Sequence, residues 1–204
     1  MPIRTVSSLD NVNLYNINTF SSINNRKRFC LDTNVLYWYT YPRYGLGEKN
    51  NKHHSQVYYD FVDKLVADGN PLITTIYNVS ELLNIVEKNE WEIYKRLNPQ
   101  LRIDKKEYRH IASERTNLQQ IMKTTISNVK SICTIVDFNF SSERLDSYVD
   151  TFTKHRCDVF DYLILNYYVE SSDINIISDD NDFVTYPGIN LYTANRKSLE
   201  ELTM

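Results

Sequence analysis

Acidic side chains stand directly after two of the predicted strands of this sequence. Asp32 follows an apolar segment, residues 28–31. Three aspartates follow a second apolar segment, residues 174–177, and these are Asp179, Asp180 and Asp182. In a parallel sheet the carboxyl ends of neighbouring strands meet at one edge, and the active sites of such folds lie there. The placement therefore predicts that carboxylates from distant parts of the chain converge.

The predicted helices supply further carboxylates. Glu81 lies early in the helix that follows a third strand, residues 71–75, and it faces away from the apolar stripe of that helix. Asp158 and Asp161 stand three residues apart in the first turn of another helix, so they share one face. At least one acidic residue therefore lies at each of these strand ends or helix starts.

Converging carboxylates repel one another unless a cation lies between them. Oxygen ligands without cysteine or histidine select a hard ion, Mg²⁺ or Mn²⁺. Such an ion activates a bound water and polarises a phosphoryl oxygen. The chemistry that this pattern favours is therefore hydrolysis of a phosphodiester.

The same acids also have structural explanations. Asp32 and Asp158 are typical N-cap residues of helices. Spacing alone does not decide between Asp158 and Asp161, or between Asp179 and Asp180, as the residue that faces a metal ion. The hypothesis of a metal site depends on the joint placement of these residues and not on any one of them.

Strands that alternate with helices predict an α/β fold, because parallel strands need crossover connections that cover both faces of the sheet. We expect a three-layer sandwich with a mostly parallel central sheet of four to five strands, plus a helical insertion. Residues 1–27 are polar and asparagine-rich and predict an extension with little structure of its own. Residues 28–204 predict one domain, with a basic helical insertion at about 95–130.

Composition excludes several classes of protein. The chain has 204 residues, of which 42% are hydrophobic and 24% charged, so a globular core is expected. It has no apolar run long enough to span a membrane. Its four glycines cannot form a dinucleotide-binding fingerprint or a P-loop. Its three cysteines have no CxxC spacing and suggest neither disulfides nor a zinc site, which fits the cytoplasm.

Charge is segregated along the chain. Residues 95–130 hold nine Lys and Arg against three Asp and Glu, whereas residues 131–182 hold three against eleven. This polarity suits a metal site beside a phosphate-binding surface. A solvated helix face is the alternative explanation of the basic segment. The candidate RNA-binding residues within it are Arg102, Lys105, Lys106 and Arg109.

Four segments resemble the PIN-domain nucleases, and most closely the VapC-like toxin ribonucleases of type II toxin–antitoxin systems. The segments are residues 29–36 (FCLDTNVL), 79–82 (VSEL), 158–164 (DVFDYLI) and 177–183 (ISDDNDF). Their order and spacing agree with that family from about residue 28 to residue 195. The chain is longer than typical toxins of this kind, mainly through the polar extension and the basic insertion.

The resemblance implies a role for individual residues. The four metal-binding acids of the family fall on Asp32, Glu81, Asp161 and Asp180. The supporting polar groups fall on Asn34, Ser178 and Asp182, with Asp158 beside them. The resemblance also implies Mg²⁺- or Mn²⁺-dependent cleavage of single-stranded RNA, a homodimer, and inhibition by an antitoxin protein.

Two other functions are compatible with parts of the pattern. A haloacid-dehalogenase-like phosphatase also has an aspartate after its first strand, but it needs a second aspartate two residues later, where this sequence has Asn34. A PIN-like module that binds RNA or protein without cutting is the non-enzymatic alternative. Activity measured with and without a chelator distinguishes these alternatives.

Overall fold

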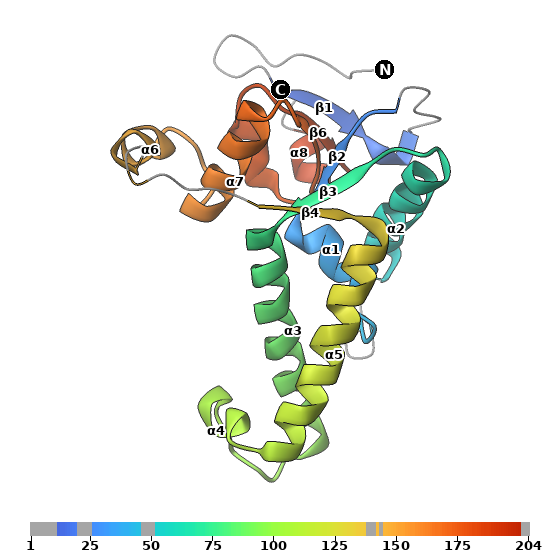
Figure 1. Ribbon diagram of the computed structural model, residues 1–204, viewed down its shortest axis with the longest axis vertical. Coiled ribbons are helices and arrows are strands. Elements are labelled where there is room, and N and C mark those ends of the chain that lie inside the picture. Colours follow the sequence, from blue (N-terminus) through green and yellow to red (C-terminus); the bar gives the residue numbers. More distant parts are fainter. Residues whose placement is uncertain (1–11, 20–25, 46–51, 138–141, 143–144, 201–204) are drawn as a thin grey trace.

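The computed structural model describes the chain except for residues 1–11, 20–25, 46–51, 138–141, 143–144 and 201–204. Its centre is a six-stranded sheet in which every pairing is parallel, with the order β1-β6-β5-β2-β3-β4 (Figure 1). The strands are β1 (Asn13–Asn16), β2 (Phe29–Leu31), β3 (Leu72–Thr75), β4 (Thr134–Val136), β5 (Asn175–Ile177) and β6 (Asn190–Thr193).

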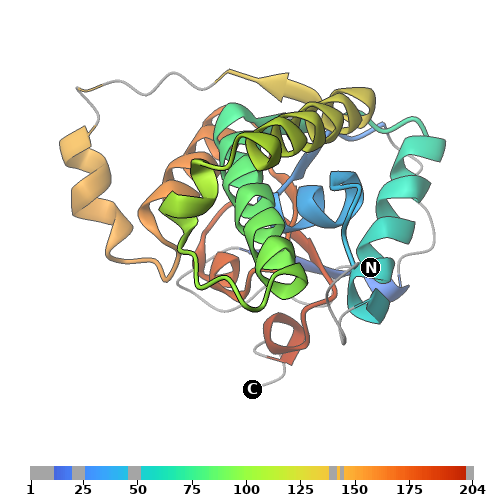
Figure 2. The same cartoon turned by 90° about the horizontal axis from the view of Figure 1, so that it is seen from below.

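Helices cover both faces of the sheet, as the three-layer prediction requires. They are α1 (Thr33–Thr40), α2 (Lys52–Ala67), α3 (Ile76–Leu97), α4 (Lys105–Arg109), α5 (Ala112–Ile132), α6 (Leu145–Phe152), α7 (Val159–Glu170) and α8 (Arg196–Glu200), with short 3₁₀ turns at η1 (Ile17–Thr19) and η3 (Asn181–Thr185). Figure 2 shows α1 and α2 on one side of the strands and α7 on the other. None of the helices within the described ranges is long and apolar enough to cross a membrane.

Alternation along the strands divides the core into two layers, because successive strand residues point to opposite faces. In β2, Phe29 and Leu31 pack with helices α1, α2 and α3, whereas Cys30 packs with α7. In β5, Ile177 packs in the layer of α1, α2 and α3, and Ile176 packs in the layer of α7. Short strands that are buried on both faces are typical of a parallel sheet.

The polar N-terminal extension was expected to have little structure of its own, and for part of it this expectation is wrong. Asn13–Asn16 form the edge strand β1, which pairs in parallel with β6. Val12 and Leu14 are each only 1% exposed, so two apolar residues anchor an otherwise polar segment. The sheet therefore has six strands and not four to five.

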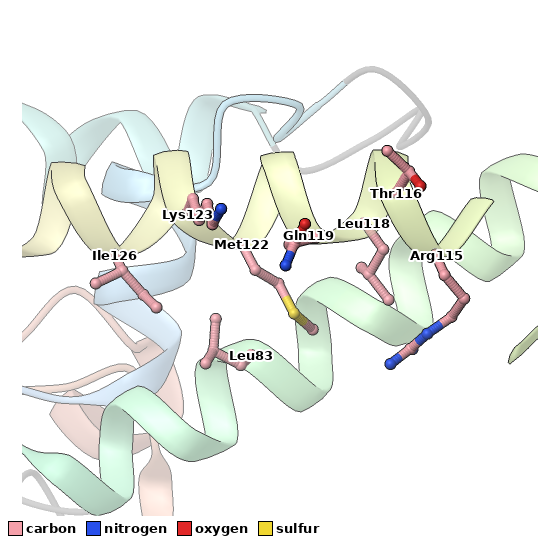
Figure 3. Close-up of a pocket in the computed structure, with 8 residues that line it drawn as sticks. All are labelled: Leu83, Arg115, Thr116, Leu118, Gln119, Met122, Lys123 and Ile126. Carbon is pink, nitrogen blue, oxygen red and sulfur yellow. The ribbon is translucent and has the colours of Figure 1, made fainter. Parts of the chain in front are cut away.

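The basic insertion is helical, as expected, and belongs to a long arm. The arm consists of α3 and α5, which extend away from the sheet, with α4 at the connection between them (Figure 1). A helix of 22 residues, the length of α3, is about 33 Å long. Figure 3 shows Met122 and Leu118 of α5 pointing toward α3, along an open groove of about 450 Å³.

The helix α4 starts with a reciprocal pair of side chain-to-backbone hydrogen bonds. The Glu107 amide donates to the Asp104 carboxylate at 2.8 Å, and the Asp104 amide donates to the Glu107 carboxylate at 2.8 Å. Such a reciprocal capping box satisfies two backbone donors that a helix start leaves without partners.

The strand order places the candidate site. After β2 the chain continues outward through β3 and β4, and it then crosses to the other side of β2 to form β5 and β6. The switch point of the sheet therefore lies between β2 and β5. Ligands of open parallel sheets bind at the carboxyl ends of the strands at such a point.

Candidate metal centre

Asp32 stands at the switch point, immediately after β2. One carboxylate oxygen accepts a hydrogen bond from the Thr33 amide at 2.7 Å, and Asp32 is the N-cap of α1. The other oxygen accepts a hydrogen bond from the Ser178 hydroxyl, beyond β5, at 2.6 Å. The capping role expected for Asp32 is confirmed. The Ser178 bond adds a link to the neighbouring strand that capping does not require.

Ser178 and Asn34 join the end of β5 to the start of α1. The Asp180 amide donates to the Ser178 hydroxyl oxygen at 2.9 Å. The Asn34 side chain lies 3.5 Å from the Ser178 hydroxyl oxygen, and its own oxygen accepts from the Asp179 amide at 3.4 Å. These two polar residues therefore hold the turn that carries Asp180 next to Asp32.

Glu81 is connected to this group through two residues that the sequence did not single out. The Thr33 hydroxyl donates to the Glu81 carboxylate at 2.6 Å. The Asn78 amide donates to the Thr33 hydroxyl oxygen at 3.1 Å and lies 3.5 Å from the Asp32 carboxylate. Asn78 also completes a capping box with Thr75 at the start of α3. The spacing of Thr75 and Asn78 is the signal that would have placed Asn78 there.

The structure distinguishes Asp158 from Asp161. Asp158 is the exposed N-cap of α7, and its carboxylate accepts from the amides of Phe160 and Asp161 at 2.8 and 3.0 Å. Asp161 is half-buried in the first turn of α7, at the wall of a cleft that Glu81 also lines. Asp158 also lines this cleft, but its carboxylate caps α7, whereas Asp161 is the half-buried acid of the pair.

The structure also distinguishes Asp179 from Asp180. The Asp179 carboxylate accepts a hydrogen bond from the Tyr58 hydroxyl at 2.7 Å and lies 2.8 Å from Nε2 of His54, both in α2. Asp180 instead accepts from the Asp182 amide at 2.8 Å and caps the η3 turn. The sequence did not predict these contacts with Tyr58 and His54, which bind the Asp179 carboxylate to α2.

Three acids of this group have raised pKa values. Burial, together with the charges of Glu81 and Asp180, raises the pKa of Asp32 to about 7. Burial, together with the charges of Asp32 and the other nearby acids, raises the pKa of Asp161 to about 8. Burial also raises the pKa of Asp180 above its ordinary value. Asp32 and Asp161 are therefore held partly protonated near neutral pH when no cation is present.

The donor set suits a hard divalent cation by its chemistry, since it offers carboxylate oxygens and no thiol. Raised carboxyl pKa values show that negative charge is costly at this place, and a cation would relieve that cost. In the part of the chain that the structure describes, however, no three acidic, histidine or cysteine side chains are grouped as a ready-made metal site.

Glu87 gathers three basic side chains of the insertion. Arg109 donates to both of its carboxylate oxygens, at 2.8 and 2.6 Å. Lys105 lies 2.9 Å and Arg115 3.3 Å from the same carboxylate. The hydrogen bond from Arg109, followed by that from Lys105, holds the pKa of Glu87 at about 2. This buried carboxylate thus fixes α4 and the start of α5 against α3.

The four residues predicted to bind RNA therefore divide into two pairs. Lys105 and Arg109 share the Glu87 carboxylate. Arg102 and Lys106 are exposed, and neither forms an ion pair with another residue in the described ranges. The sequence did not foresee this division, because Glu87 lies 22 residues from Arg109.

No protein-family model matches the sequence, and no curated protein matches it either. The case for a function therefore depends on the residues and the geometry of this acidic group.

Proposed function

We propose that this chain is a Mg²⁺- or Mn²⁺-dependent endoribonuclease that hydrolyses phosphodiester bonds of single-stranded RNA in the cytoplasm. The observation that carries the proposal is the acidic group at the switch point, where burial and mutual charge raise the pKa of Asp32, Asp161 and Asp180. A group of this kind gains stability from a divalent cation. The resemblance of four segments to PIN-domain nucleases supports RNA as the substrate.

In this proposal Asp32, Glu81, Asp161 and Asp180 hold the cation. When bound, the cation supplies an activated water and polarises the phosphoryl oxygen. The Ser178 and Thr33 hydroxyls orient the Asp32 and Glu81 carboxylates through the two 2.6 Å hydrogen bonds. Preset orientation of this kind reduces the reorganisation that binding would otherwise require.

A protein partner is part of the proposal. A ribonuclease that acts on cellular RNA must be held silent, and the resemblance to VapC-like toxins suggests a small antitoxin, with the nuclease as a possible homodimer. An arginine or lysine of the antitoxin would pair with the acidic group in place of the cation. The exposed carboxylate of Glu81 is accessible to such a side chain.

The direct test is cleavage of a labelled single-stranded RNA by the purified chain, with Mn²⁺ and with Mn²⁺ plus EDTA. We expect internal cleavage that EDTA abolishes. RNA binding without cleavage would favour the non-catalytic module. Release of phosphate from a phosphomonoester, with intact RNA, would favour the phosphatase.

Arg102 and Lys106 provide a prediction about how RNA is attracted to an acidic site. Glu87, which fixes α4 against α3, is six residues after Glu81, about 9 Å along α3, so an RNA strand that is bound at the acids and runs along α3 passes the basic side chains of the arm. Replacing both residues in the variant Arg102→Gln/Lys106→Gln is expected to weaken RNA binding and to reduce the salt slope of log affinity by about 1.4, because two phosphate contacts are lost.

The measurement is RNA affinity across a salt series, in the presence of Ca²⁺. The matched control is Lys27→Gln/Lys130→Gln, which removes two exposed charges at the amino edge of the sheet, before β2 and before β4. An equal reduction in the salt dependence of RNA affinity in both double variants would contradict a specific role for α4.

A further inference from the structure

A cleft opens between α3 and the start of α7, beside the candidate metal centre. Its volume is about 330 Å³. Three acids lie in its wall, Glu81 on α3 and Asp158 and Asp161 at the start of α7, and Glu81 and Asp161 belong to the acidic group. A ligand in this cleft would therefore lie next to a phosphate that is held at the proposed metal centre.

Aromatic and apolar side chains form part of the wall. Phe160, in the first turn of α7, is 64% exposed, and within the described residues its ring contacts no other aromatic ring. Tyr77 lines the cleft from α3, and Ile164, one turn after Phe160, is buried beneath it. Val159, the residue before Phe160, is 47% exposed, and adjacent exposed apolar side chains beside a cleft are typical of a ligand-binding site.

Asn84 adds a polar side chain to the wall of the cleft. It lines the same cleft from α3, one turn after Glu81, and it is exposed. Its side-chain amide forms no hydrogen bond with another residue that the structure describes. An asparagine amide offers both donors and an acceptor, which are the groups that recognise the edge of a base.

We propose that this cleft is a nucleobase subsite, which takes one unpaired base of the RNA next to the scissile phosphate. The proposal rests on the proposed nuclease function and names how that site would hold its substrate. A base is planar and uncharged, so it tolerates the Glu81 and Asp161 carboxylates that would repel a second phosphate. Phe160 stacks on the base, and Asn84 hydrogen-bonds to its edge.

An arginine of a protein partner would also suit a cleft that combines aromatic rings and carboxylates. The nucleobase is favoured because the proposed cation neutralises Glu81 and Asp161 whenever RNA is cut. The Asp158 carboxylate, which also lines the cleft, is occupied by the amides of Phe160 and Asp161, so the aromatic ring and the Asn84 amide remain as the recognition groups. The arginine alternative is therefore an outcome that the experiment must separate.

The experiment compares cleavage kinetics of Phe160→Ala, Phe160→Tyr and Asn84→Ala on short oligouridine, oligoadenosine and oligocytidine RNAs with Mn²⁺. Because both positions are exposed, the variants are expected to fold. Phe160→Ala should raise KM roughly tenfold or more with little change in kcat, since it removes one stacking contact. Phe160→Tyr should restore the KM. Asn84→Ala should change the relative kcat/KM of the three RNAs.

The control is Val66→Ala, which truncates an exposed apolar side chain at the end of α2. Val66 lies shortly before β3, at the amino ends of the strands, whereas the candidate metal centre lies at their carboxyl ends. An unchanged KM in Phe160→Ala would overturn the subsite while wild-type cleavage still supports the nuclease. Weaker binding of a tetra-arginine peptide by Phe160→Ala, with an unchanged KM for RNA, would assign the cleft to a protein partner. No cleavage by the wild type would contradict the proposed function itself.

Discussion

Replacing Asp32 by asparagine is expected to lower Mn²⁺-dependent cleavage of RNA by roughly a thousandfold or more, because metal stabilisation of the transition state amounts to several kcal/mol. The fold should survive. Asparagine caps a helix as well as aspartate does, so the bond to the Thr33 amide is retained. The measurement is kcat at saturating RNA and Mn²⁺, with the melting temperature as the check on folding.

The matched control for this variant is Asp104→Asn. Asp104 is also an aspartate that caps a helix, α4, but it lies on the arm, away from the acidic group. Its variant should keep wild-type kcat. Wild-type kcat in Asp32→Asn would remove Asp32 from the metal centre, whatever else holds the ion.

Without a divalent cation, the free energy of unfolding is expected to fall as pH rises from about 4 to about 8. Asp32 and Asp161 have pKa values of about 7 and about 8 in the folded chain, against an ordinary value of 3.8. Between these values the folded chain binds more protons than the unfolded chain, so raising the pH favours unfolding. The loss is on the order of a few kcal/mol for the coupled pair.

Mn²⁺ should reverse this loss, because the cation binds the ionised carboxylates of the folded chain only. At about a hundred times the dissociation constant, a ligand adds about 2.7 kcal/mol, which raises the melting temperature of a chain of this size by roughly 5–10 °C. The measurement is the melting temperature from pH 4 to pH 8.5, in EDTA and in Mn²⁺.

The double variant Asp32→Asn/Asp161→Asn is the control for the pH dependence. In EDTA, the melting temperature of this variant should depend less on pH than that of the wild type. Mn²⁺ should not raise its melting temperature. A wild-type melting temperature that does not change with pH in EDTA would show that these carboxylates titrate normally, and the electrostatic argument for a metal centre would fail.

Much of the fold could be predicted from the sequence, because the central strands are short apolar runs. The segments that form β2, β3 and β5 each carry consecutive buried residues between polar ones. The edge strand β1 was missed for a physical reason. The segment is mostly polar, with Leu14 as its aliphatic residue, so it lacks the apolar run that predicts a strand. Its strand structure depends on pairing with β6, which lies 177 residues away in the sequence.

The sequence proposed residues for the candidate site but not the directions of their side chains. Order and spacing selected Asp32 and Glu81 as candidates, yet nothing local showed that Thr33 bridges them, because that contact joins residues 48 positions apart. The choice between Asp179 and Asp180 depends on Tyr58, whose ring is fully buried in α2. Which way a side chain points is fixed by packing against distant elements, and spacing carries little information about it.

The order of strands in the sheet also determines when the acidic group can form during synthesis. Asp32 is made early, but its partner Ser178 is 146 residues later, and β5 cannot pair with β2 until that segment has left the ribosome. Contacts of such high sequence separation form slowly, and domains fold as their chain emerges. A nascent or truncated chain that ends before β5 contains the whole basic arm and three of the four acids, but it lacks Asp180 and the Ser178 hydroxyl that orients Asp32. Such a fragment would keep the surface proposed to attract RNA while lacking the means to cut it.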